Sequence, residues 1–340
     1  MSSQTPPSPP PRPFVHPLRA FSAPAQARAE LWRTALGAAL AAGLAIGFGA
    51  LARRGFFTAM AEGGPLATLI PPGAADMLGT LVGFLGVWPA LWLVVRVLHR
   101  RPGATLFGPD GRVNWRHFRI GLGISLGVGA LAWLPILHRH GPETFALAPL
   151  GVWAPLALAA APMIFIQAAA EELFFRGYLL QQIAARTWSI LGWSVLPSAL
   201  FAMAHPAAAG PLGISWYHFV FGLVMAAVTS RTANLGGAIG LHLGTNLVNL
   251  LIVSPERHLS GLALFVYPPG MDARAAIYTY IAVMFLGATV FMARMDLRFL
   301  REWKAHKRAT QSAGRPAEPL PMKIYAPGEA TRRPAPPERP

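Results

Sequence analysis

The sequence predicts an all-α protein, a polytopic transmembrane helical bundle with about eight spans. Three observations favour this fold class: 54% of the 340 residues are apolar, only 13% are Asp, Glu, Lys or Arg, and the mean hydropathy is +0.42. A soluble domain carries about 25% charged residues, so the composition excludes an ordinary water-soluble enzyme and a disordered chain. Because the chain has no cysteine, disulfide frameworks, Cys-ligated zinc, iron–sulfur clusters and thiol catalysis are excluded too.

The candidate spans are apolar runs, since a bilayer core takes about 20 apolar residues per helix. They comprise residues 34–51, 77–98, 120–137, 152–170, a run ending near 214, 216–229, 235–253 and 275–293. An even number of spans places both chain termini on the same side of the membrane.

The basic residues indicate which side that is. With this set of spans, 24 of the 29 Lys and Arg residues flank one face of the membrane. This bias predicts a multi-pass protein of the cell (inner) membrane with both termini cytoplasmic. The net charge of +15 is therefore mainly a topology signal, which also favours anionic lipid headgroups as neighbours in the bilayer. We expect no nucleic-acid partner, because aromatic residues are not interleaved with a folded basic surface.

The composition divides the chain into five parts. Residues 1–30 and 301–340 are rich in proline and are predicted to be disordered cytoplasmic tails, the second of them basic. Residues 31–150 are predicted to form N-terminal transmembrane helices, 151–255 the core that carries the chemistry, and 256–300 the last transmembrane helix. The first apolar run lies too far from Met1 for an ordinary secretory signal peptide, so we expect a retained span.

A pair of adjacent acids follows the apolar run 152–170. Glu172 and Arg176 are four residues apart, so they share a helix face and can form an ion pair. Glu171 points about 100° away, and its neighbour one turn back is Gln167. One acid can thus be neutralised while the other stays available, which gives two carboxylates different roles. The alternative is that both acids end a helix at the cytoplasmic surface.

A histidine and an Asn-containing motif stand in two further apolar runs. His205 is four residues after Phe201, near Pro197, Pro206 and Pro211, which indicate irregular helix. His242 and Asn246 share a helix face, and Asn249 lies on roughly the same stripe; the glycines around them allow close helix approach. Alternatively, His205 is a structural histidine and the third motif is interhelical polar packing. A single catalytic cavity would account for all three motifs together.

These side chains suit hydrolysis with water as the nucleophile. A desolvated glutamate near an imidazole can take a proton from water and later deliver it to a leaving group. An imidazole and an amide on one helix face can donate hydrogen bonds to an oxyanion. The set suits cleavage of an amide bond by water. Alternatively, two His and one Glu suffice to hold a divalent metal such as zinc.

The three motifs in this order resemble the CPBP family of intramembrane proteases. That family includes CAAX prenyl endopeptidases of the Rce1 type and bacteriocin-processing or bacteriocin-immunity relatives. The resemblance covers roughly residues 160–253, about a quarter of the chain, and the stretch from Phe221 to Ile239 also resembles the third motif region. It implies an intramembrane endopeptidase, acting in CAAX-type or peptide-maturation processing, with a peptide or membrane-protein substrate.

The resemblance also implies roles for the motif residues. Glu171 and His205 would activate the water, His242 and Asn246 would stabilise the oxyanion, and Glu172 and Arg176 would support the site. No cofactor follows with certainty; the family's label as metalloproteases leaves a zinc ion held by Glu171, His205 and His242 as an alternative. The absence of a tight ligand pair such as His-x-x-x-His favours the metal-free version.

This mechanism makes a geometric demand on the helices. If the fourth helix ended at Ala170, Glu171 and His205 would lie about 25 Å apart by the helical rise. We therefore predict that this helix continues to about Ala184, that the next span runs from about Val195, and that the two side chains lie within about 10 Å. Two other functions remain open: a non-catalytic binding or immunity protein of the same fold, and a proton-coupled transporter, which the lack of an internal repeat disfavours.

Overall fold

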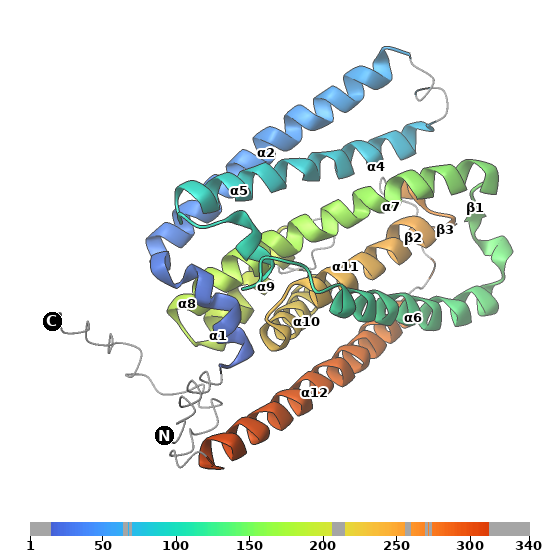
Figure 1. The fold of residues 1–340 in the computed structure, drawn as a ribbon. Helices are drawn as coiled ribbons and strands as arrows, with labels where there is room; N and C mark the ends of the chain where they lie inside the picture. The colour runs from blue at the N-terminus through green and yellow to red at the C-terminus, as the bar shows by residue number, and fades with distance from the viewer. Residues whose placement is uncertain are drawn as a thin grey trace, which may run out of the picture. The chain divides into compact units, whose positions relative to one another are not determined.

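The computed structural model describes residues 15–63, 67, 70–205, 215–255, 260–268, 271 and 274–312. Helices dominate this part of the chain, as Figure 1 shows. The α-helices are α1 (Pro17–Ser22), α2 (Leu31–Ala61), α4 (Pro72–Gly83), α5 (Val87–Val97), α6 (Trp115–His140), α7 (Leu150–Glu172), α8 (Gln181–Arg186), α9 (Leu196–Met203), α10 (Trp216–Thr232), α11 (Gly236–Leu247) and α12 (Arg274–Ser312).

Shorter 3-10 and π turns join these helices, and one small sheet completes the fold. The 3-10 turns are η1 (Ala23–Arg28), η2 (Phe84–Gly86), η3 (Gly103–Phe107), η4 (Pro142–Thr144) and η9 (Ser260–Leu262). The π turns are η5 (Leu173–Leu180), η6 (Leu191–Val195) and η8 (Val248–Ile252). The strands β1 (Ala146–Leu147), β2 (Val253–Pro255) and β3 (Phe265–Tyr267) pair in the order β1-β3-β2.

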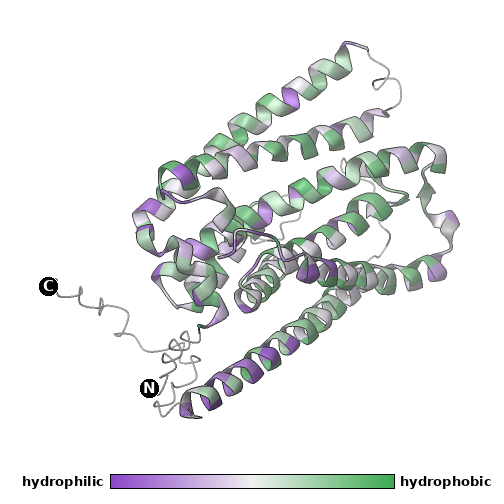
Figure 2. Cartoon of the chain, in the orientation of Figure 1, coloured by the Kyte–Doolittle hydropathy of each residue, from purple (hydrophilic) through white to green (hydrophobic). Residues whose placement is uncertain are grey.

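Five helical stretches in the described part of the chain are long and apolar enough to cross a membrane. They are Leu31–Ala61, Pro72–Val97, Trp115–His140, Leu150–Arg186 and Thr279–Ser312. Leu191–Met203 and Gly236–Ile252 are apolar but shorter, so five helices reach span length where the sequence suggests about eight. The predicted class, a polytopic helical bundle, is confirmed. In Figure 2 hydrophobic residues run along most helices, and hydrophilic ones gather at the C-terminal end of α12.

The helix that carries the paired acids does not end at them. α7, η5 and α8 form one continuous helix over Leu150–Arg186, which confirms the predicted extension to about Ala184. Glu171 and Glu172 therefore lie inside this helix, and the alternative in which they end it is wrong. The π turn η5 begins directly after Glu172, and such turns occur frequently at functional sites.

The helix that carries His242 and Asn246 packs closely on α6. A Cβ atom built on Gly240 would lie 2.1 Å from the Phe118 carbonyl oxygen, and one built on Gly121 would lie 2.5 Å from that of Gly237. Only glycine permits this separation of the two backbones. The close helix approach predicted from the glycines is thus present, and it fixes the face that α11 turns away from α6.

The N-terminal tail differs from the prediction. Residues 17–28, expected within a disordered tail, form α1 and η1, and Leu18, Phe21 and Ala25 are buried. Pro17 occupies the first position of α1, where its missing N–H costs nothing, and apolar residues recur every three or four positions. Gln181 Nε2 donates a hydrogen bond to the Phe21 carbonyl at 2.8 Å. At the other end, helix α12 continues through residues 301–312 of the second predicted tail, while residues 1–14 and 313–340 lie outside the described residues.

His99, between α5 and η3, ties this N-terminal segment to the bundle. Its side chain is buried, its Nδ1 donates to the Arg28 carbonyl at 3.1 Å, and its Nε2 lies 2.9 Å from the Tyr178 hydroxyl. Burial, as the largest cause, and the nearby Arg101 and Arg33 guanidinium groups together lower the pKa of His99 to about 4, against the hydrogen bond to Arg28 and the charge of Glu30, which raise it. The folded protein therefore holds this imidazole neutral at pH values where an exposed histidine is protonated.

Stability should consequently fall as the pH drops from about 6.5 to about 4. In that window the unfolded chain binds a proton that folded His99 does not, so the free energy of unfolding decreases with decreasing pH. Thermal unfolding in detergent between pH 4 and 7.5 measures this loss. The His99→Gln variant, which cannot titrate, should show a shallower slope; equal slopes in both proteins would contradict the assignment.

Candidate active site

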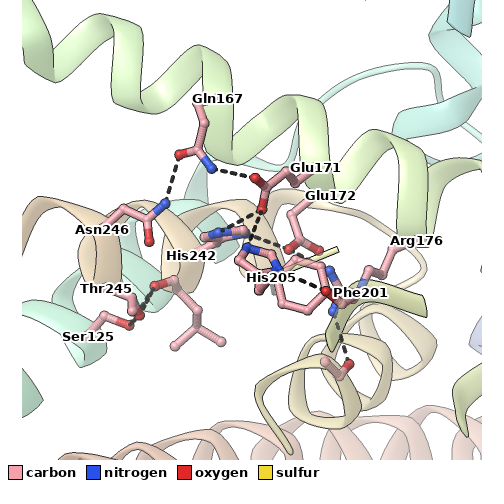
Figure 3. Close-up of polar contacts among 12 residues, drawn as sticks. Ser125, Gln167, Glu171, Glu172, Arg176, Phe201, His205, His242, Thr245 and Asn246 are labelled. Carbon is pink, nitrogen blue, oxygen red and sulfur yellow. Dashed lines mark hydrogen bonds and ion pairs between the residues drawn. The ribbon is translucent and has the colours of Figure 1, made fainter. Parts of the chain in front are cut away.

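The three motifs meet at one cavity of about 290 Å³, lined by residues of α4, α7, α10 and α11 and of the segment around α9. Gln167 and Glu171 come from α7, His205 from the residues just after α9, and His242 and Asn246 from α11. Figure 3 shows these side chains turned toward one another. Side chains that are far apart in the sequence, and costly in an apolar bundle, therefore converge.

Glu171 lies at the centre of this group and is 8% exposed. Its Oε1 accepts a hydrogen bond from Gln167 Nε2 at 2.7 Å. Its Oε2 has no hydrogen-bond partner among the described residues, and it lies 3.5 Å from His242 Nε2 and 3.9 Å from His205 Nε2. The side chains of Glu171 and His205 thus lie well within the predicted 10 Å.

The hydrogen-bond partners of the Nδ1 atoms show which ring nitrogen of His205 and of His242 carries a hydrogen. His205 Nδ1 lies 2.8 Å from the Phe201 carbonyl oxygen, and His242 Nδ1 lies 2.8 Å from Glu172 Oε1. Both partners are acceptors, so each Nδ1 carries the hydrogen and donates it. In the neutral rings, each Nε2 therefore keeps its lone pair, and both lone pairs lie on the side of Glu171 Oε2.

Glu172 and Arg176 form a fully buried ion pair, as their spacing predicts. Arg176 Nη1 donates to Glu172 Oε1 at 2.8 Å, and both side chains are 0% exposed. Arg176 Nη2 donates to the Gly222 carbonyl at 3.2 Å, and the guanidinium lies 4.7 Å from the centroid of the Phe201 ring. Because Glu172 Oε1 also accepts from His242, this pair orients an imidazole of the cavity in addition to neutralising one acid.

Asn246 joins the group through Gln167. Its Nδ2 donates to Gln167 Oε1 at 2.7 Å, and no hydrogen bond among the described residues uses its second N–H. Asn249, in the π turn η8 that continues α11, also lines the cavity, as its position on the same stripe predicts. The site thus holds an acid, two imidazoles and an amide donor.

Residues 152–248 match the family model described as Type II CAAX prenyl endopeptidase Rce1-like. This segment is similar to that family, and we refer to it as the Rce1-like segment. It falls within the core expected at 151–255 and contains Glu171, His205, His242 and Asn246. The Rce1-like family is a family of membrane proteases, and the match supports a peptidase activity in general.

A curated relative extends the similarity beyond the Rce1-like segment. The chain is 27% identical over 225 residues to the uncharacterized protein YyaK of Bacillus subtilis (strain 168), a match that covers 64% of this chain and 75% of that protein. No solved structure matches the chain significantly. The relationship therefore includes helices outside residues 152–248.

The cavity of the Rce1-like segment also contains a third imidazole that motif analysis missed. The ring of His218 stacks on that of His205, with centroids 4.0 Å apart and planes inclined by 14°. His218 Nδ1 lies 2.6 Å from the hydroxyl of Ser215, which caps the start of α10. The sequence does contain a signal for the start of the helix that carries His218, because a serine three residues before it directly precedes an apolar run.

Motif analysis also missed one wall of the cavity. Met77, Thr80, Leu81 and Phe84 line the cavity from α4 and the turn that follows it. Their spacing of three, four and seven residues is that of a single helix face. Three of the four are apolar, so a helix that precedes residues 152–248 adds an apolar wall to the cavity.

The cavity holds the types of side chain that a zinc site uses. Imidazole nitrogens and carboxylate oxygens are ligands that zinc accepts. Within the described ranges, however, no group of three His, Asp or Glu side chains has an arrangement that could hold a metal ion. Zinc on Glu171, His205 and His242 therefore stays an alternative that the arrangement of the described residues does not favour.

Proposed function

We propose that this chain is an intramembrane endopeptidase that hydrolyses a peptide bond with a water molecule activated by Glu171 and His205. The observation that carries the proposal is the convergence of Glu171 Oε2 with the Nε2 atoms of two histidines. Separations of 3.5 and 3.9 Å are long for direct hydrogen bonds and suit a water molecule that bridges these groups.

In the first step, a water proton passes to Glu171 Oε2 while the water oxygen attacks the carbonyl carbon of the peptide. The Nε2 lone pair of His205 accepts the second hydrogen of the water and so orients the attacking oxygen. Glu171 then gives its proton to the amide nitrogen, the C–N bond breaks, and the products are a carboxylic acid and an amine. Glu171 thereby returns to its carboxylate form.

The oxyanion formed by the attack is stabilised by Asn246, whose second N–H is available. His242 is restricted in this role. Its Nδ1–H is used by Glu172, so its Nε2 donates only when both ring nitrogens carry a proton. Asn246 is therefore the donor that acts in either protonation state of His242.

The substrate class follows from the apolar wall that α4 and the turn after it add to the cavity. Met77, Leu81 and Phe84 form this wall, so we propose a peptide with an apolar residue beside the bond to be cleaved. CAAX-type tails and peptide or membrane-protein precursors both meet this requirement. The excess of Lys and Arg supports a location in the cell membrane, with both termini in the cytoplasm.

A cleavage screen in proteoliposomes of phosphatidylethanolamine and phosphatidylglycerol tests the proposal. Peptides that vary in one position, from apolar to charged, are incubated with the wild-type chain and with Asn246→Ala. We expect cleavage beside apolar residues, and a kcat about 10²–10³-fold lower in the variant, because one oxyanion donor is lost.

Peptides that are bound but never cut would overturn the endopeptidase function and support a binding protein. Cleavage that Asn246→Ala leaves unchanged would overturn the role of Asn246 as the oxyanion donor. A parallel sample with chelator, followed by zinc addition, separates the two forms of the mechanism. A loss of cleavage that zinc reverses would replace the glutamate mechanism by a metal-dependent one.

A further inference from the structure

Gln167 links the acid of the proposed mechanism to the oxyanion donor. It lies on α7 one helical turn before Glu171 and is 7% exposed. Its Nε2 donates to Glu171 Oε1 at 2.7 Å, and its Oε1 accepts from Asn246 Nδ2 at 2.7 Å. As Figure 3 shows, a single side chain thus bridges α7 and α11 directly beside the cavity.

The direction of each hydrogen bond in this chain of three side chains is fixed by chemistry. An ionised carboxylate only accepts, so Gln167 must present its nitrogen to Glu171 and therefore its oxygen to Asn246. That oxygen also only accepts, so Asn246 must present its nitrogen. The carboxylate charge therefore sets the orientation of both amides, including that of the amide on a different helix.

This order has two consequences for the cavity. Glu171 Oε1 is occupied, which leaves Oε2 as the oxygen that approaches His205 and His242. The Asn246 amide is held with its nitrogen on the side of the acid, so its second N–H is available for an oxyanion. Gln167 thus places both the base Glu171 and the oxyanion donor Asn246, although Asn246 lies 79 residues after Gln167 in the chain.

We infer that Gln167 is a positioning residue that makes Glu171 and Asn246 act as one unit, an inference that rests on the proposed endopeptidase function. A side chain that only filled space could be replaced by methionine, which has a similar length and no hydrogen-bonding group. A positioning side chain cannot, because without it the carboxylate and the Asn246 amide each lose the partner that sets their direction.

A double-mutant cycle on kcat tests the inference with Gln167→Met, Asn246→Ala and the double variant, all in the proteoliposome assay. We expect Gln167→Met to lower kcat by about 10–100-fold, with KM changed by less than about threefold. The double variant should be within about threefold of Asn246→Ala, because a unit that has lost one member loses little more with the second.

The matched control is Gln181→Met, the same substitution on the same continuous helix. Gln181 is buried and bonds the Phe21 and Thr105 carbonyls, and it does not line the cavity. Its kcat per folded molecule, measured after size exclusion, should equal that of the wild type. If Gln167→Met does not fold, Gln167→Asn replaces it: the shorter amide cannot reach both partners, and the same loss of kcat is expected.

The results separate this inference from the function on which it rests. Wild-type cleavage that falls in Asn246→Ala but not in Gln167→Met overturns the role of Gln167 alone. Losses in kcat that multiply in the double variant also overturn the role of Gln167, because they indicate independent contributions. An effect of Gln167→Met on KM alone overturns it as well, because the expected loss is in kcat. A wild-type chain that cleaves no peptide overturns the endopeptidase function and the positioning role together.

Discussion

Replacing Glu171 by glutamine is expected to abolish peptide cleavage while the protein still inserts and folds. The amide keeps the shape of the side chain and an oxygen that can accept from Gln167, so the surrounding hydrogen bonds survive. It cannot accept a proton from water, and loss of a general base lowers rates by about 10²–10⁴-fold. Initial cleavage rates in proteoliposomes, normalised to the folded protein recovered from size exclusion, measure the effect.

Glu143→Gln provides the comparison for this substitution. Glu143 is exposed in η4 and does not line the cavity, so the same chemical change there should leave the rate within about twofold of wild type. Full activity of Glu171→Gln would remove the acid from the mechanism.

The largest expected effect on stability is that of Arg176→Met. The variant leaves the carboxylate of Glu172 fully buried without its ion-pair partner, and breaking a buried pair in this way costs about 3–5 kcal/mol. Methionine can fill much of the volume beside Phe201, so the loss is electrostatic more than steric. Reversible unfolding in mixed micelles, followed by tryptophan fluorescence, gives the free energy of unfolding.

An exposed pair with the same spacing calibrates that measurement. Arg298 donates to Glu302 at 2.8 Å, but the two side chains are 60% and 53% exposed. Water screens this pair, so Arg298→Met should cost no more than about 1 kcal/mol. If both variants lost equally little stability, the buried pair would contribute no more than a surface contact, and its assigned role in holding the site would be wrong.

Contacts within one helix were predictable from the sequence. Four-residue spacing on a helix predicted that Glu172 would pair with Arg176, and that Glu171 would lie beside Gln167. The approach of Glu171 to His205 was also predicted, because only a helix that continues past the acids brings the two to the same depth. These inferences needed nothing beyond helical geometry and the cost of polar groups in an apolar bundle.

Contacts between distant segments were not predictable in the same way. Glu172 accepts a hydrogen bond from His242, 70 residues away, and nothing local to either residue specifies it. The stacking of His218 on His205 likewise depends on how α10 packs beside α9. The proline-rich composition was misleading for residues 17–28, because the buried side chains of Leu18, Phe21 and Ala25 dock α1 and η1. Composition averages over a segment, whereas docking depends on the few side chains that fit.

The docked N-terminal segment has a practical consequence for anyone preparing this protein. Trimming the chain to residue 31, a natural choice for removing a proline-rich leader, would also remove Phe21 and the carbonyl that receives the Gln181 amide. The Gln181 amide lies on the same continuous helix as Glu171, so the trimmed chain would lose a contact that holds this helix to the N-terminal segment. Affinity tags and protease sites are therefore best placed ahead of Val15.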